Sequence, residues 1–123
     1  MYDENNVFAK VIRGEIPATK VYEDAAVLAF QDISPAAPKH VLVVPKDKYI
    51  SLADFLEKAD DKTIAAFFKT TGKIAADMGL AKSGYRIITN HGKDASQTVP
   101  HFHVHILGGQ PLGPLVSGDR KVR

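Results

Sequence analysis

Three histidines alternate with apolar residues near the end of the chain, in the run His-Phe-His-Val-His-Ile-Leu at positions 101–107. This alternation predicts a β-strand, because successive side chains of a strand point to opposite faces of a sheet. The three imidazoles would then share one face at intervals of about 6.8 Å and point outward, while the apolar residues between them face the core. Such a strand would hold catalytic groups rigidly, as catalysis requires.

Three imidazoles on one face allow three interpretations. Neutral imidazole is abundant near pH 7, since its unperturbed pKa is about 6.5, and it attacks phosphorus well, which favours nucleophilic and acid–base catalysis. A zinc site is the second interpretation, because His-x-His on a strand directs two nitrogens toward one ion. Against zinc, the chain has no cysteine, and no carboxylate adjoins the histidines as a supporting partner. The third interpretation is a histidine-rich polar face without chemistry.

Polar residues elsewhere in the chain favour the catalytic interpretation. Asn90 and the loop Ser96-Gln97-Thr98 offer amide and hydroxyl donors for an anion beside the histidines. The segment Asp32-Ile33-Ser34 offers a carboxylate that suits ribose hydroxyls, next to an apolar patch. Each piece also has a plain structural interpretation, since Asp and Ser form turns before proline and Asn turns the chain. Their combination favours a nucleotide site.

Apolar periodicity and breaker residues outline the elements that must position this chemistry. Helices are predicted near 7–13, 51–58 and 60–78, and strands at 20–23, 26–31, 40–45, 85–90 and 101–107. The strand at 40–45 is continuously apolar, which is typical of a central strand covered on both faces. Strands joined by short turns, with two main helices between them, predict an α+β fold with a mostly antiparallel five-stranded sheet.

Length and composition bound the remaining possibilities. The 123 residues predict a single domain at 1–123, with a motif-bearing core at about 7–109 and an irregular tail, rich in Pro and Gly, at 110–123. A net charge of +2, from 16 Lys and Arg against 14 Asp and Glu, is too even for a nucleic-acid-binding surface. No apolar run approaches the roughly 20 residues of a membrane span, and the acidic start is unlike a signal peptide. The absence of cysteine suits a reducing compartment, so we expect a cytoplasmic protein without membrane or nucleic-acid partners.

The run at 101–107 has the His-φ-His-φ-His-φ-φ pattern, where φ is apolar, of the histidine triad (HIT) superfamily. The chain resembles most closely the Hint branch, the histidine triad nucleotide-binding proteins. Further matching segments lie at 7–17, 29–35, 40–46, 84–86, 97–99 and 108–109, so the resemblance covers most of the chain. Galactose-1-phosphate uridylyltransferases are less similar, because their triad ends in Gln where this chain has His105.

The resemblance implies a HIT-like fold whose sheets join across the two-fold axis of a homodimer. It also implies binding of purine nucleoside monophosphates and hydrolysis of their amine and acyl conjugates, the phosphoramidates and acyl-adenylates, with release of AMP or GMP. No cofactor and no metal ion are implied. Superfamily members with a structural zinc site generally use Cys, which this chain lacks.

For catalysis, the resemblance implies that His103 is the nucleophile, which attacks the α-phosphorus and forms a covalent nucleotidyl-histidine. His101 would orient this nucleophile through its main-chain carbonyl, and His105 would hold phosphate oxygens in the transition state. The hydroxyl of Thr98 would help to protonate the leaving amine. His40 would tune the protonation of the triad.

For nucleotide binding, the resemblance implies a set of residues that surrounds base, ribose and phosphate. Asp32 would accept hydrogen bonds from both ribose hydroxyls, and the main chain of Ser96 would hold phosphate oxygens. Ordinary core packing explains the residues around the base equally well. The set comprises Val7, Phe8, Val11 and Phe30 for the base, Asp32 and Ile33 for the ribose, and Asn90, Ser96, Gln97, Thr98, His103 and His105 for the phosphate.

Three departures from the family pattern bear on these roles. Ser96 stands where the family often has Gly, so a positive φ there would strain the backbone. Pro100 precedes the triad where an aromatic or aliphatic residue is usual, and it removes one main-chain donor. The tail lacks the Trp that some relatives place near the partner's active site.

Two other functions stay open at this point. A Fhit-like hydrolase of dinucleoside polyphosphates needs room for two nucleotides, and the segments Gly108-Gly109 and Ile16-Pro17 favour the Hint-like alternative. A nucleotide-binding interaction module with incidental catalysis is the other function. The intact His103 and Thr98 count against it.

Overall fold

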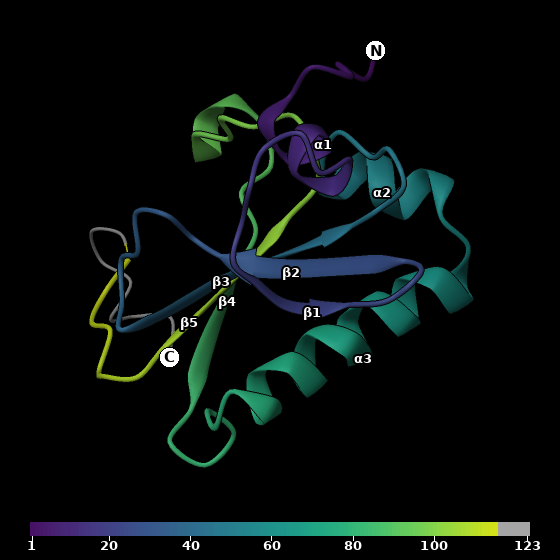
Figure 1. The fold of residues 1–123 in the computed structure, drawn as a ribbon. Helices are drawn as coiled ribbons and strands as arrows, with labels where there is room; N and C mark the ends of the chain where they lie inside the picture. Colours follow the sequence, from purple (N-terminus) through teal and green to yellow (C-terminus); the bar gives the residue numbers. More distant parts are fainter. Residues whose placement is uncertain (116–123) are drawn as a thin grey trace.

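Five strands form one antiparallel sheet in the computed structural model, which describes residues 1–115 (Figure 1). Their order across the sheet is β1-β2-β3-β5-β4, and every neighbouring pair is antiparallel. The strands are β1 (Lys20–Glu23), β2 (Val27–Gln31), β3 (Lys39–Pro45), β4 (Tyr85–Ile88) and β5 (Val104–Gly108). The predicted α+β fold is confirmed. The predicted irregular tail has no helix or strand at 110–115, and its remainder at 116–123 lies outside the described residues.

Each α-helix begins after a residue that caps its free N–H groups. The helices are α1 (Val7–Ile12), α2 (Leu52–Lys58) and α3 (Asp61–Asp77), and their caps are Asn6, Ser51 and Asp60 in that order. One turn of 3-10 helix, η1 (Lys93–Ala95), lies in the loop before β5. Gly79 follows α3 with a φ of +82°, the left-handed stop that the sequence predicts. None of the helices in this described part is long and apolar enough to cross a membrane.

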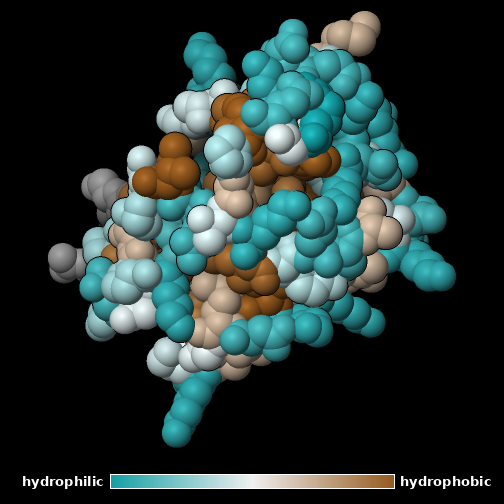
Figure 2. All heavy atoms as spheres, viewed as in Figure 1, coloured by the Kyte–Doolittle hydropathy of each residue, from teal (hydrophilic) through white to brown (hydrophobic). Residues whose placement is uncertain are grey.

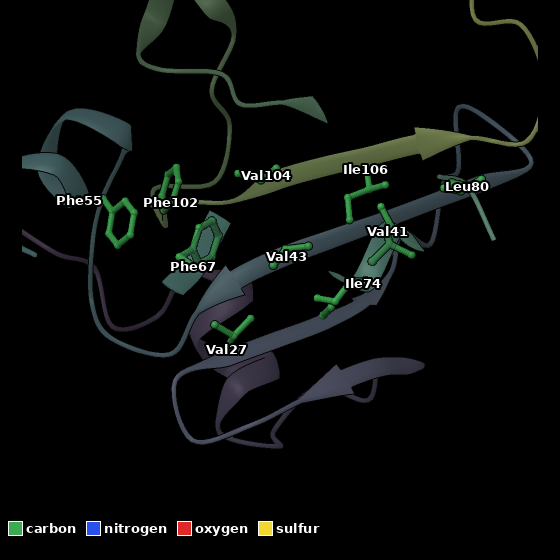
Figure 3. Close-up of a cluster of buried hydrophobic side chains, with 12 residues drawn as sticks. Val27, Val41, Val43, Phe55, Phe67, Ile74, Leu80, Phe102, Val104 and Ile106 are labelled. Carbon is green, nitrogen blue, oxygen red and sulfur yellow. The ribbon is translucent and has the colours of Figure 1, made fainter. Parts of the chain in front are cut away.

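The central strand β3 separates two hydrophobic layers. Val41 and Val43 face the layer that contains Phe55 of α2 and Phe67 of α3 (Figure 3). The alternate side chains of β3, such as Leu42, face the smaller layer built around α1. All of β3 after its first residue is buried, so the prediction of a central strand covered on both faces is confirmed.

The histidine-bearing strand is shorter than its alternation predicts. β5 begins at Val104 rather than at position 101, because the main chain before it is bonded elsewhere. The N–H of Phe102 donates to the carbonyl oxygen of Tyr49 at 2.7 Å, and the N–H of His101 bonds within its own loop. These groups are therefore not available to a neighbouring strand. β4 likewise ends at Ile88, before its predicted end at position 90.

The shorter strand changes where the first histidine lies. His103 and His105 share the α1 face of the sheet as predicted, and both line one cavity there. His101 is 0% exposed, and its ring is anchored behind that cavity rather than presented outward. The prediction that all three imidazoles point outward is therefore wrong.

Candidate active site

A cavity of about 410 Å³ lies on the α1 face of the sheet, between α1, β2, β3 and the loop before β5. Figure 2 shows apolar side chains in patches on an otherwise hydrophilic surface, one of them over α1. The cavity is lined by every residue that the resemblance assigns to the nucleotide, namely Val7, Phe8, Val11, Phe30, Asp32, Ile33, Asn90, Ser96, Gln97, Thr98, His103 and His105. Sequence reasoning missed the lining residues Ile16, Pro17, Ala18, Gln31, Leu42 and Val99. Of these, Leu42 follows from strand alternation, since it shares a face with His40.

Part of the cavity wall is apolar. Phe8 and Phe30 meet edge to face with their ring centroids 5.6 Å apart, and both belong to the hydrophobic layer around α1. Ile33 also lines the cavity but is 94% exposed, which places it at the mouth. The aromatic residues therefore serve the core and the cavity at once. Core packing and contact with a ligand, the two interpretations of these residues from the sequence, are therefore compatible.

Next to Phe8 on the cavity wall, the hydrogen bonds of His103 decide which of its nitrogens is free. Its Nδ1 lies 2.7 Å from the carbonyl oxygen of His101, which can only accept, so Nδ1 carries the proton. In the neutral ring Nε2 is then an unprotonated lone pair. Burial lowers the pKa of His103 below its usual value, against smaller raising effects of the His101 carbonyl and Asp32. His103 is therefore neutral at pH 7 and competent as a nucleophile.

A backbone amide, acting through His40, gives His105 the opposite tautomer to that of His103. The N–H of Ala36 donates to Nδ1 of His40 at 3.0 Å, so the proton of the neutral His40 ring lies on Nε2. That Nε2 lies 2.9 Å from Nδ1 of His105 and donates to it, which leaves the proton of His105 on its own Nε2. Burial, and then the nearby His103 and His40, lower the pKa of His105 to about 4. The cavity thus meets a neutral N–H donor beside the free nitrogen of His103, with the two ring centroids 5.2 Å apart.

Asp32 both begins a turn and lines the cavity. Its Oδ1 accepts from the N–H of Ser34 at 2.8 Å, so the turn-forming interpretation of this residue is confirmed. Its Oδ2 lies 3.5 Å from Nε2 of His40. A carboxylate has about four acceptor sites, so these contacts leave capacity for a ligand hydroxyl.

The loop before β5 corrects two predicted phosphate contacts. The side chain of Gln97 accepts from Gly92 and donates to the carbonyl oxygens of Ile50 and Val99, at 2.9, 2.8 and 3.1 Å. Its amide therefore holds the loop together and is not free for an anion. The Ser96 N–H donates to a carbonyl oxygen within the loop at 3.0 Å, so it is not free either.

Ser96 has the strained backbone that the sequence predicts for a positive φ. Its φ is +60°, and among the residues described it is the only one other than glycine with a positive φ.

Unlike the Gln97 side chain, Asn90 and Thr98 have no hydrogen-bond partner within residues 1–115, and both line the cavity. Both are polar groups of this wall that a phosphate could use.

Asp32, His40 and His105 could be considered as metal ligands, because their ligand atoms lie within 4.8 Å of one another. The expectation that no carboxylate adjoins the histidines is therefore wrong. The hydrogen bonds nevertheless do not fit a metal ion. The Ala36 amide makes Nδ1 of His40 an acceptor and so keeps a proton on Nε2, the nitrogen that would have to bind the ion.

His101 does not line the cavity and lies behind His103. Its Nε2 lies 2.8 Å from the carbonyl oxygen of Pro45, and its Nδ1 lies 2.5 Å from the hydroxyl of Tyr2. Burial lowers its pKa to about 4, so its ring is neutral at pH 7. Its contribution to the cavity is the main-chain carbonyl that fixes His103.

The antiparallel sheet, with two neutral histidines of opposite tautomer over a small-molecule cavity, defines a protein of the histidine triad class. The model of the HIT domain family matches residues 13–112, and the chain belongs to this family. Relatives described as HIT family hydrolases place it among the hydrolases.

Two curated relatives illustrate the similarity. An uncharacterized HIT-like protein of Azospirillum brasilense is 49% identical over 116 residues, which cover 94% of this chain and 95% of that protein. The purine nucleoside phosphoramidase of Escherichia coli is 40% identical over 114 residues, which cover 93% of this chain and 95% of the enzyme.

Solved structures agree in fold. A histidine triad protein from Clostridium difficile matches with a TM-score of 0.82 and 44% identity, over 94% of this chain and 100% of that chain. A HIT family hydrolase from Legionella pneumophila matches with a TM-score of 0.79 and 39% identity, over 89% and 100%.

Proposed function

We propose that this protein hydrolyses purine nucleoside 5′-phosphoramidates and acyl-adenylates, and that it releases AMP or GMP through a covalent intermediate on His103. One observation carries the proposal. The His101 carbonyl holds the proton of His103 on Nδ1 at 2.7 Å, which leaves the Nε2 lone pair for the cavity. The name of the Escherichia coli relative, purine nucleoside phosphoramidase, supports the substrate class.

The chemistry follows in two displacements. Nε2 of His103 attacks the α-phosphorus, a bond forms between them, and the bond from phosphorus to the leaving group breaks; this group is the amine of a phosphoramidate or the carboxylate of an acyl-adenylate. The leaving nitrogen takes up a proton, which the Thr98 hydroxyl relays from water. Water then attacks the same phosphorus and releases both the nucleotide and the histidine. The N–H of His105 faces the phosphate oxygens and stabilises their charge in both steps.

In this proposal, the base, ribose and phosphate of the nucleotide lie in turn against the apolar and then the polar side chains of the cavity wall. The purine base lies against Phe8 and Phe30, whose rings offer flat apolar surface. The ribose lies beside Asp32, whose carboxylate retains free acceptor sites. The phosphate then reaches the histidines, Asn90 and Thr98.

A competitive assay tests the proposal. We expect turnover of an adenosine 5′-phosphoramidate to exceed that of diadenosine tetraphosphate, because the proposed binding mode places a single nucleotide in the cavity of about 410 Å³. Quenching with alkaline detergent during turnover should trap labelled AMP on the protein, and later treatment with acid should release the label, because a bond between phosphorus and histidine nitrogen is stable to alkali and labile to acid. Faster cleavage of the dinucleotide would favour a Fhit-like hydrolase instead. Binding of AMP without any turnover would favour an interaction module.

We also propose that two chains form a homodimer through β4, which lies at an edge of the sheet and, among residues 1–115, pairs only with β5. Tyr85 and Ile87 leave apolar surface exposed on this strand. The opposite edge, β1, carries Lys20 and Glu23 in ion pairs, and charged edges discourage strand pairing. A cytoplasmic location stays a prediction from the sequence.

A further inference from the structure

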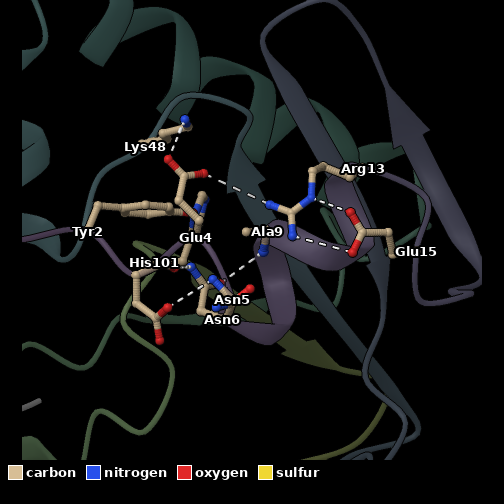
Figure 4. A network of polar contacts seen from close by, with 10 residues as sticks. Tyr2, Glu4, Asn5, Asn6, Ala9, Arg13, Glu15, Lys48 and His101 are labelled. Atoms are coloured by element: carbon tan, nitrogen blue, oxygen red, sulfur yellow. Dashed lines mark hydrogen bonds and ion pairs between the residues drawn. The ribbon is translucent and has the colours of Figure 1, made fainter.

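Tyr2 does not line the cavity, yet it contacts the histidine that orients the nucleophile (Figure 4). Its hydroxyl lies 2.5 Å from Nδ1 of His101. The two rings also meet edge to face, with centroids 5.6 Å apart and planes inclined by 72°. The segments that resemble the family begin at position 7, so the resemblance assigns Tyr2 no role.

The two ring nitrogens of His101 have fixed and opposite roles. Nε2 faces the carbonyl oxygen of Pro45 at 2.8 Å, and a carbonyl only accepts, so Nε2 carries the proton. Nδ1 of the neutral ring is then an acceptor, and the hydroxyl of Tyr2 is its donor. His101 is fully buried. Without Tyr2, its Nδ1 would be a buried acceptor with no partner, which is costly.

The main chain of His101 is not held by the sheet. β5 begins at Val104, so the carbonyl that accepts from His103 lies on a loop that no strand pairing fixes. The N–H of Phe102, in the same peptide unit as this carbonyl, donates to the carbonyl oxygen of Tyr49 at 2.7 Å, so that bond and the anchoring of the His101 ring together set the position of the carbonyl. Tyr2 and the carbonyl of Pro45 hold the ring from its two nitrogens.

The segment that carries the tyrosine is itself fixed to α1. Asn6 is buried, donates to the carbonyl oxygen of Asp3 at 2.8 Å and accepts from the N–H of Ala9 at 2.9 Å. Glu4 forms an ion pair with Lys48 at 2.6 Å (Figure 4). Tyr2 therefore directly precedes a turn, from Asp3 to Asn6, that is anchored to α1 and to Lys48.

The same helix also contacts the nucleophile. Phe8 of α1 meets the ring of His103 edge to face, with centroids 4.8 Å apart. The turn before α1 and α1 itself thus contact the first and second histidines of the triad.

We propose that Tyr2 is a positioning residue of the triad: its hydroxyl holds the His101 ring and, through the His101 carbonyl, keeps His103 in the Nδ1–H form with Nε2 free. The kinetic consequence of this inference rests on the proposed function. The tautomer of His103 does not, because it can be measured without any substrate.

The test compares Tyr2→Phe with a matched variant, Tyr22→Phe. Each loses one hydroxyl hydrogen bond, but that of Tyr22 runs to Asp24 at 2.7 Å and lies outside the cavity. Two-bond ¹H–¹⁵N NMR reports which nitrogen of each imidazole carries the proton. We expect wild type and Tyr22→Phe to show His103 in the Nδ1–H form, and Tyr2→Phe to show a mixture of tautomers.

Kinetics with an adenosine 5′-phosphoramidate supply the second readout. We expect Tyr2→Phe to lower kcat about fivefold to tenfold, the effect of one lost hydrogen bond, and to change KM by less than about twofold. Tyr22→Phe should keep the wild-type kcat. A wild-type His103 tautomer in Tyr2→Phe, with or without a lower urea midpoint, would overturn the proposal and leave Tyr2 a purely structural residue. If the wild type cleaves no phosphoramidate, the proposed function fails, and the NMR result still decides the role of Tyr2.

Discussion

At the scale of single residues, the hydrogen-bond partners of the ring nitrogens determine which nitrogen of each histidine carries the proton. The carbonyl of His101 leaves Nε2 of His103 bare, whereas the amide of Ala36, acting through His40, leaves Nε2 of His105 protonated. The types and spacing of the triad residues predict a histidine that attacks phosphorus. The tautomer of His105 cannot be predicted in this way, because the deciding contact between His40 and His105 joins residues 65 positions apart.

His103→Ala tests the nucleophile. We expect kcat for an adenosine phosphoramidate to fall by several orders of magnitude, because the covalent route disappears. The affinity for AMP should change by less than about tenfold, since the apolar slot and the ribose contact remain. Steady-state kinetics and calorimetric titration of AMP check the two halves of this prediction. Retention of a tenth of the wild-type kcat would remove His103 from its assigned role.

Asp32 is expected to recognise the ribose. One of its oxygens holds the turn at Ser34, and the free acceptor sites can take the 2′- and 3′-hydroxyls in charge-assisted hydrogen bonds. Loss of one hydroxyl should cost roughly 1–3 kcal/mol, so AMP should bind roughly 5- to 150-fold more tightly than 2′-deoxy-AMP. Asp32→Ala should remove most of that preference. Calorimetric titration of both nucleotides into both proteins measures it, and equal affinities for the wild type would exclude Asp32 from the site.

At the scale of elements, local rules predicted most of the fold. Caps, apolar spacing and the stop at Gly79 identified α3, and a continuous apolar run identified β3 as the central strand. The alternation of histidine and apolar residues predicted too early a start for β5. The repeat begins in a loop, where the N–H of Phe102 bonds to the distant carbonyl of Tyr49. Tyr2 was missed for the same reason, since its partner lies 99 positions away.

The loop before β5 stores strain at Ser96, whose φ is +60°. Ser96→Gly should relieve the contact between Cβ and the backbone and raise the free energy of unfolding by about 0.5–1 kcal/mol. Activity should be retained, because the Ser96 N–H serves the loop and not the cavity. Urea unfolding measures the gain. Ser83→Gly is the control: it lies in a turn without positive φ, so glycine should leave stability unchanged or lower it. A less stable Ser96→Gly variant would contradict the strain.

At the scale of the whole molecule, buried histidines link stability to pH. Burial lowers the pKa of His101 and of His105 to about 4, whereas both titrate near 6.5 in an unfolded chain. Between pH 6.5 and 4 the unfolded chain therefore binds more protons than the folded one. The stability from neutral histidines is complete above pH 6.5 and is lost as the pH falls through this window.

Urea unfolding from pH 7 to pH 4 tests this linkage. For the fully buried His101, the shift from about 6.5 to about 4 corresponds to a loss of about 3 kcal/mol over that range. His101→Asn should be less stable than the wild type at pH 7, because it loses a fully buried ring. It should lose less stability on acidification, because asparagine does not titrate in this range. A wild-type stability that stays constant from pH 6.5 to 4.5 would contradict the neutral burial of these rings.

The two edges of the sheet lead to opposite expectations for assembly. Ile87 on β4 and Val21 on β1 are 40% and 39% exposed, so they form a matched pair of apolar edge residues. If two chains join through β4, Ile87→Glu places an uncompensated charge in the interface and should raise the dimer dissociation constant about 100-fold or more. Val21→Glu should leave the dimer intact. Sedimentation equilibrium of the three proteins measures this. A wild-type monomer at tens of micromolar, or dissociation by Val21→Glu alone, would exclude β4 as the joining edge.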